Sequence, residues 1–212
     1  EWNRRQRQMC IRDSIYGIDD GGSTWVAKAS EIATAIGDQA IEVDRDAAFP
    51  EKLVSLLAEG GFFGLCLPGD VGGGGQPPAV CAGVVEQLAQ VCSSTAMIYV
   101  MHIVGTQTLA ASQTFSRRDD LLREVAAGRH MTTLAFSERG SRSHFWAPES
   151  RLRENENGGF LISASKSWVT SANHADSYVS SAQSPDAASP LESTLYLARP
   201  GASGIQVSGG FD

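Results

Sequence analysis

Two short polar motifs decide how this chain is organised: SERGSRSH at Ser137–His144 and KSWVTS at Lys166–Ser171. Runs rich in Thr and apolar residues flank them, with Met131–Phe136 before the first, Gly159–Ala164 before the second and Ser177–Ser180 after it. Such runs, bounded by Gly, Asn and Pro clusters, predict strands of an antiparallel sheet. The motifs then lie where strands end, which is where a rigid scaffold usually holds its functional residues.

The residue types in the two motifs suit a polar ligand. The first offers hydroxyls, two arginines and the small pair Gly140-Ser141, and such a loop can bind a phosphate or the polar edge of a cofactor ring. A solvated turn is the alternative interpretation. The second places the indole of Trp168 between Ser167 and Thr170, although a tryptophan near a strand more often packs in a core.

Together and in this order, the motifs resemble the flavin-binding signature of the acyl-CoA dehydrogenase family. That signature reads Thr/Ser-Glu-Pro-x-x-Gly-Ser-Asp and then Gly-x-Lys-x-Trp-Ile-Thr-Asn. The matching residues are Ser137, Glu138, Ser143, Lys166, Trp168 and Thr170. The departures are Arg139, Arg142 and His144, which stand at the family's Pro, Gly and Asp. The resemblance covers roughly residues 24–212.

The resemblance implies an α+β fold, with an all-α bundle over residues 15–129 and an antiparallel, barrel-like β domain over residues 130–212. We expect the chain to be the front portion of such an enzyme, with a second helical bundle beyond Asp212. Residues 1–14 do not begin with Met and are interpreted as a non-native leader. A genuine basic arm for an acidic partner is the alternative.

The implied activity is FAD-dependent α,β-dehydrogenation of an acyl-CoA thioester, in which a carboxylate takes the α-proton and the β-hydride goes to flavin N5. The implied cofactor contacts are Leu134, Ala135, Phe136, Ser137, Ser143, Trp168, Val169 and Thr170. Arg142 and Ser143 are the implied substrate contacts. We expect no catalytic residue in this chain, with the base downstream of Asp212, so that the fragment alone is inactive.

The implied partners are acyl-CoA, an electron-transfer flavoprotein or another electron acceptor, and further copies in a homotetramer or homodimer. Two alternatives remain open. One is a flavin-dependent monooxygenase on the same fold, which the unusual Arg139, Arg142 and His144 keep in view. The other is a non-catalytic module that binds flavin or acyl groups. Fold alone does not choose among these chemistries.

Composition argues against several kinds of partner and site. The net charge of −7 over 212 residues argues against nucleic acid or anionic membranes as partners. No apolar run approaches the roughly 18 residues of a membrane helix. The cysteines have no zinc spacing, so we expect no metal site and reduced, mostly buried thiols of a cytoplasmic protein. They are Cys10, Cys66, Cys81 and Cys92.

Apolar periodicity predicts five helices before the strands. The first begins at Ser23 or Thr24 and continues to Asp46, and the second follows Pro50 and stops at Gly60-Gly61. The third begins near Pro77-Pro78. Between the second and third, four glycines from Gly72 lack the residues of a phosphate loop and predict a permissive turn instead.

The fourth and fifth helices complete the predicted bundle. Ser93-Ser94-Thr95 caps the fourth, which is apolar on nearly all sides and is therefore expected at the buried centre. His102 lies on this helix and is interpreted as a satisfied core residue. The fifth helix covers about Arg117–Ala127 and ends at Gly128.

Overall fold

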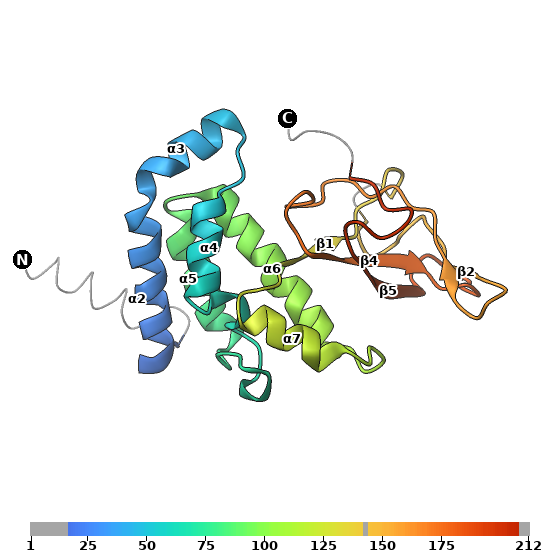
Figure 1. The fold of residues 1–212 in the computed structure, drawn as a ribbon, viewed down its shortest axis with the longest axis horizontal. Coiled ribbons are helices and arrows are strands. Elements are labelled where there is room, and N and C mark those ends of the chain that lie inside the picture. Colours follow the sequence, from blue (N-terminus) through green and yellow to red (C-terminus); the bar gives the residue numbers. More distant parts are fainter. Residues whose placement is uncertain (1–16, 142–143, 208–212) are drawn as a thin grey trace, which may run out of the picture. The chain divides into compact units, whose positions relative to one another are not determined.

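The computed structural model describes residues 17–141 and 144–207, with helices in the first part of the chain and strands in the second (Figure 1). The chain divides into two compact units. One holds the residues up to Val100 together with Ala126–Gly128, and the other holds Met101–Val125 and the residues from Arg129 on. The predicted domain boundary at 129/130 stays a prediction, and the predicted leader lies outside the described residues.

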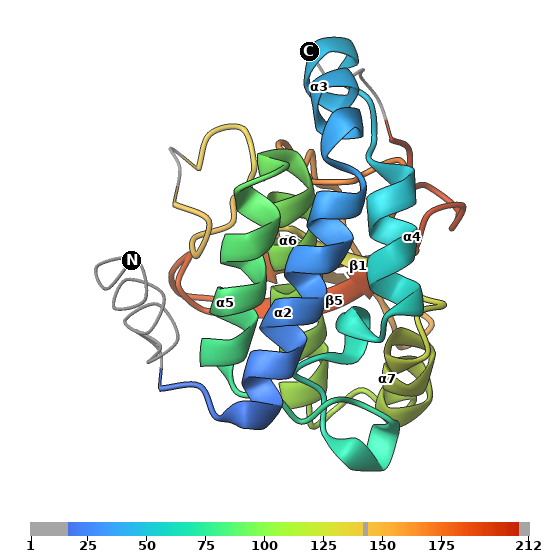
Figure 2. The ribbon, with the colours of Figure 1, turned by 90° about the vertical axis from the view of Figure 1, so that its left-hand side faces the viewer.

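Helices build the first unit. They are α2 (Asp20–Ala35), α3 (Gly37–Asp46), α4 (Glu51–Glu59), the short 3₁₀ helices η1 (Phe62–Gly64) and η2 (Gly69–Val71), α5 (Pro78–Ala89) and the first part of α6 (Ser93–Ala111). Figure 2 shows α2 lying between α4 and α5, and it contacts both. Buried leucines, valines and aromatic residues fill this unit: Leu53, Leu57, Phe62, Leu65, Leu67, Val80, Val84, Leu88 and Tyr99.

The first predicted helix ends at Asp46 as expected, but its start and its continuity were predicted wrongly. Asp19 is the N-cap, and its Oδ1 accepts a hydrogen bond from the amide of Gly22 at 2.8 Å, so the helix begins before Ser23. The predicted single helix is also two. Ile36 leaves helical geometry at φ −129°, and Gly37, which has low helix propensity, follows it at the break.

Two glycines allow α2 and α5 to approach closely. A Cβ on Gly22 would lie 2.5 Å from Val80 Cγ2, and a Cβ on Gly83 would lie 2.9 Å from Val26 Cγ2. The glycine-rich segment forms a turn, as predicted. In it the amide of Gly74 donates to the carbonyl of Gly64 at 2.9 Å.

Helix α6 is less buried than its sequence predicts. Met97 and Val104 expose 53% and 43% of their surface, so one stripe of the helix is uncovered by the described residues. His102, in contrast, is 1% exposed, and its Nδ1 accepts a hydrogen bond from the amide of Thr132 at 3.2 Å. This agrees with the interpretation of His102 as a core residue.

The second unit contains the end of α6, most of α7 (Arg118–Ala126) and five strands. The strands are β1 (Thr132–Ala135), β2 (Arg153–Glu154), β3 (Phe160–Leu161), β4 (Ser177–Gln183) and β5 (Ser193–Ala198). They form one sheet in the order β1-β4-β5 and a separate β2-β3 pair, and the described strands close no barrel.

The expectation of a purely antiparallel sheet was wrong for β1. This strand pairs with β4 in parallel, with Leu134 opposite Val179, whereas β5 pairs with β4 antiparallel. A parallel pair requires a long crossover. The connection from β1 to β4 provides one, and it contains both polar motifs.

Candidate flavin site

The two motifs meet at the end of β1. The amide of Ser167 donates to the carbonyl of Ser137 at 2.9 Å, and Glu138 and Lys166 form an isolated antiparallel bridge. This ladder joins residues that the sequence separates by almost thirty positions. The strand predicted at Gly159–Ala164 is shorter than expected, since only Phe160–Leu161 pairs regularly, and the remaining residues lead into the bridge.

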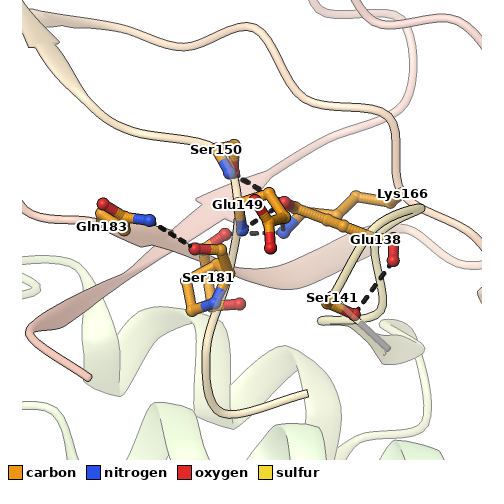
Figure 3. Close-up of polar contacts among 8 residues, drawn as sticks. Glu138, Ser141, Glu149, Ser150, Lys166, Ser181 and Gln183 are labelled. Carbon is orange, nitrogen blue, oxygen red and sulfur yellow. Dashed lines mark hydrogen bonds and ion pairs between the residues drawn. The ribbon is translucent and has the colours of Figure 1, made fainter. Parts of the chain in front are cut away.

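The carboxylate of Glu138 is the centre of the junction (Figure 3). Its Oε2 accepts hydrogen bonds from the amides of Glu149 and Ser150, each at 2.8 Å. Its Oε1 accepts from Ser150 Oγ and from Lys166 Nζ, each at 2.5 Å. Four donors therefore occupy the acceptor positions of this carboxylate.

Lys166 extends the junction to the sheet. Its Nζ also donates to the carbonyl of Ser181 in β4 at 2.6 Å. The side chains of Glu138 and Lys166 expose only 4% and 12% of their surface, so this is a buried ion pair. The sequence interpretation assigned neither residue a role of this kind. The available signal was that each motif contains one residue of an oppositely charged pair, Glu138 in the first and Lys166 in the second.

Burial and pairing act on the charges in opposite directions. Burial would raise the pKa of Glu138, but the hydrogen bonds from Lys166 and Ser150 outweigh it, and the pKa lies below the usual value. Burial lowers the pKa of Lys166, although its hydrogen bond with Glu138 acts to raise it. Because its carboxylate is occupied and its pKa is depressed, Glu138 is unsuited to serve as a general base.

A second layer holds the segment that supplies these amides. The amide of Gln183 donates to the carbonyl of Ser150 at 2.8 Å, and its Nε2 donates to the carbonyl of Pro148 at 2.8 Å. Arg151 in turn donates to Gln183 Oε1 at 2.6 Å. The loop after the first motif is therefore fixed along the end of β4.

The structure brings most of the predicted cofactor residues to this junction. Leu134 and Ala135 lie in β1, and Phe136 and Ser137 follow them half-buried. Val169 and Thr170 are also half-buried. Arg142 and Ser143 lie outside the described residues, so their predicted contacts stay predictions.

Trp168 is not a core residue, contrary to the usual behaviour of a tryptophan near a strand. It exposes 94% of its surface and has a positive φ of 56°. An exposed indole on strained backbone is costly unless something covers it or uses it. Ser171, three residues on, also has a positive φ, of 59°.

Three buried hydroxyls have no hydrogen-bond partner among the described residues. They are Thr133 Oγ1 in β1, Ser171 Oγ at the end of the second motif and Ser181 Oγ in β4. Their residues are 2%, 5% and 3% exposed. Such groups usually have a partner, so each offers a polar atom that a ligand or water can satisfy. No three His, Cys, Asp or Glu side chains gather for a metal ion within the described residues.

The chain combines helices with a small sheet, and the two motif segments between β1 and β4 pair with each other to form a polar junction. Residues 27–129 match the family model of the acyl-CoA dehydrogenase N-terminal domain. These residues, about half of the chain, belong to the acyl-CoA dehydrogenase family. This confirms the predicted family and fold class.

Individual relatives agree with this assignment. A probable acyl-CoA dehydrogenase of Mycobacterium tuberculosis is 30% identical over 136 residues, which cover 64% of this chain and 34% of the relative. The structure of butyryl-CoA dehydrogenase from Megasphaera elsdenii gives a TM-score of 0.81 at 17% identity, over 88% of this chain and 50% of that one.

A nitrososynthase from Micromonospora carbonacea has the same fold, with a TM-score of 0.76 at 23% identity over 92% of this chain and 50% of that one. The chain thus spans about a third to a half of the length of the proteins it matches. Because the fold carries more than one named activity, the fold does not identify the reaction. Within the part of the chain that the structure describes, no helix is long and apolar enough to cross a membrane.

Proposed function

We propose that the chain binds FAD at the junction of its two motifs and forms the flavin-binding part of an acyl-CoA dehydrogenase-type oxidoreductase. The observation that carries the proposal is the direct ladder between Ser137 and Ser167, which brings the end of β1 beside the exposed Trp168. Family membership supports the choice of FAD as the ligand. The butyryl-CoA dehydrogenase and related folds support the choice of acyl-CoA thioesters as the substrate class.

The residues at the junction fit a flavin. The exposed indole of Trp168 offers an aromatic surface on which a ring system can pack. Ser137 offers a hydroxyl to the polar edge of the ring, and the backbone of Leu134–Phe136 lies next to it. The unpartnered hydroxyls of Thr133 and Ser171 would gain partners from a polar ligand or its bound waters. Thr170 is proposed to lie near atom N5 of the flavin ring.

When bound, FAD would supply the hydride acceptor, and the chain would orient it. Trp168 would shield one side of the ring from water. Ser137 and the peptide groups before it would fix the ring in its plane. Arg142 and Ser143 are proposed to contact acyl-CoA. Glu138 is excluded as the proton-abstracting base because Lys166, Ser150 and Glu149 already occupy its carboxylate.

The proposed contact of Ser137 is tested by FAD titration of Ser137→Ala. Loss of one hydrogen bond should raise the FAD dissociation constant by about 2- to 12-fold, corresponding to about 0.5–1.5 kcal/mol. Ser163→Ala, an exposed serine in the same unit, is the matched control and should bind FAD like the wild type. Equal affinity for FAD in all three proteins would show that Ser137 does not contact the cofactor.

The monooxygenase remains the second candidate, favoured by the loop departures at Arg139 and His144. The two functions differ in their response to substrate. A dehydrogenase site predicts that an acyl-CoA thioester perturbs the absorption of bound FAD under anaerobic conditions. A monooxygenase site predicts no response to acyl-CoA and faster consumption of oxygen by the reduced flavin when its own substrate is added.

A further inference from the structure

We propose that the buried Glu138–Lys166 ion pair is a positioning pair, which fixes the register between the two motif segments and thereby the geometry in which they hold the flavin. The flavin part of this inference rests on the proposed function. The register part concerns the chain itself and can be measured without FAD.

The position of the pair favours this role. Glu138 directly follows Ser137, and Lys166 is two residues before Trp168, so the pair lies next to the proposed contacts on both segments. Lys166 also reaches the carbonyl of Ser181 in β4, the strand that pairs with β1. The ion pair therefore ties the end of β1, the Trp168 segment and β4 to one another.

The chemistry of the pair penalises other registers. Burying two charges is costly, and a buried pair is favourable only when its hydrogen bonds are satisfied. Here Glu138 accepts four hydrogen bonds, and Lys166 donates to both Glu138 and Ser181. A slip of one residue would turn these side chains to the opposite face and leave a buried charge without its partner.

A pair that served stability alone could be replaced by apolar groups at little cost, and often with a gain in stability. The two roles can therefore be separated by removing both charges together. Glu138→Gln/Lys166→Met keeps the side-chain volumes close to the originals.

Ser150→Ala is a milder variant that removes only the hydroxyl donor to Oε1 of Glu138. Glu124→Gln is the matched control, because it breaks an ion pair with Arg129 whose side chains are 50% and 61% exposed.

The direct readout is hydrogen exchange of the Ser167 amide in the flavin-free chain, since that amide makes the ladder bond to Ser137. The second readout is the FAD dissociation constant. We expect the double variant to remain folded while Ser167 exchange and the dissociation constant each rise by about tenfold or more. Ser150→Ala should give smaller changes in the same direction, and Glu124→Gln should give none.

Wild-type exchange and wild-type FAD affinity in a folded double variant would overturn the proposal, because the pair would then act in stability alone. If the double variant does not fold, Ser150→Ala decides: unchanged exchange at Ser167 overturns the register role, and raised exchange supports it. Failure of the wild-type chain to bind FAD would overturn the proposed function, while Ser167 exchange would still test the register.

Discussion

Glu138 shows how the environment of a side chain decides its role. A carboxylate has the right chemistry for a general base, and only the family resemblance, not the residue type, argued against this role for Glu138. Four hydrogen-bond donors and 4% side-chain exposure make it a structural anion instead. The donors at Glu149 and Ser150 come from a loop outside both motifs, so no pattern within either motif predicts them.

His130 is a second buried residue with a defined role. Its Nε2 lies 2.8 Å from Ser177 Oγ, and Ser177 Oγ donates to Thr132 Oγ1 at 3.0 Å. With Ser177 donating to Thr132, this network is consistent with the tautomer of His130 that carries its proton on Nε2. This chain of hydrogen bonds links the start of β1 to the start of β4, and the sequence interpretation missed it.

Protonation of His130 should destabilise the second unit. Burial lowers the pKa of His130 and is the largest effect on it. Arg199 also lowers this pKa, and Asp176 and Glu124 raise it by less than burial lowers it. The unfolded chain therefore binds a proton at a higher pH than the folded chain. Stability is fully present above about pH 6.5 and falls as the pH drops toward the lower folded pKa.

The measurement is urea unfolding of the wild type and His130→Gln between pH 5 and 8. Gln can still donate to Ser177 but does not titrate, so the variant should lose less stability between pH 7.5 and 5.5. The stability of the wild type should therefore fall more steeply with decreasing pH than that of the variant. Parallel pH profiles would contradict the assignment to His130.

At the scale of elements, helix packing depends on the glycines between α2 and α5. Gly22→Ala should destabilise the chain by about 1–3 kcal/mol, because the new Cβ would lie 2.5 Å from Val80 Cγ2 and from Ile18 Cγ2. Gly21→Ala is the control in the same helix turn, and its Cβ would meet only Asp19 Oδ1 at 3.4 Å. Thermal unfolding should rank Gly22→Ala below the wild type and Gly21→Ala at or slightly above it. A reversed order would contradict the close packing.

Sequence periodicity predicted the positions of helices better than the pairing of strands. The apolar stripe of α4, the proline before it and the glycines after it are local signals, and each was found at its predicted place. The break at Ile36 was missed because an isoleucine continues the apolar stripe on both sides of it. The parallel partner of β1 was missed because strand pairing depends on the path of the crossover rather than on the strand's own residues.

At the scale of the whole molecule, the motifs predicted the location of the site but not its construction. Ser137, Trp168 and Thr170 were placed at the junction by resemblance alone. The ion pair, the amides of Glu149 and Ser150 and the link to Ser181 depend on segments brought together only in the folded chain. Long-range contacts of this kind leave no periodic signal in a single sequence.

The occupied carboxylate of Glu138 leads to a prediction for activity. The chain loaded with FAD should not oxidise acyl-CoA thioesters at ordinary enzyme rates of about 1–10³ per second, because a missing general base alone typically costs about 10²–10⁴-fold. Dye-coupled assays with short, medium and branched acyl-CoAs test this. Turnover in the ordinary range would show that another residue of the chain serves as the base.

We propose that the motif junction binds FAD with Trp168 against the ring. The most direct measurement is FAD titration of the wild-type chain, Trp168→Phe and Trp25→Phe, followed by flavin absorption and fluorescence. Trp25 is the matched control, because it packs edge-on against Phe62 in the first unit. We expect all three proteins to bind FAD, with a shifted flavin spectrum and altered affinity only in Trp168→Phe. No binding by the wild type, or the same spectrum and affinity in all three proteins, would contradict the claim.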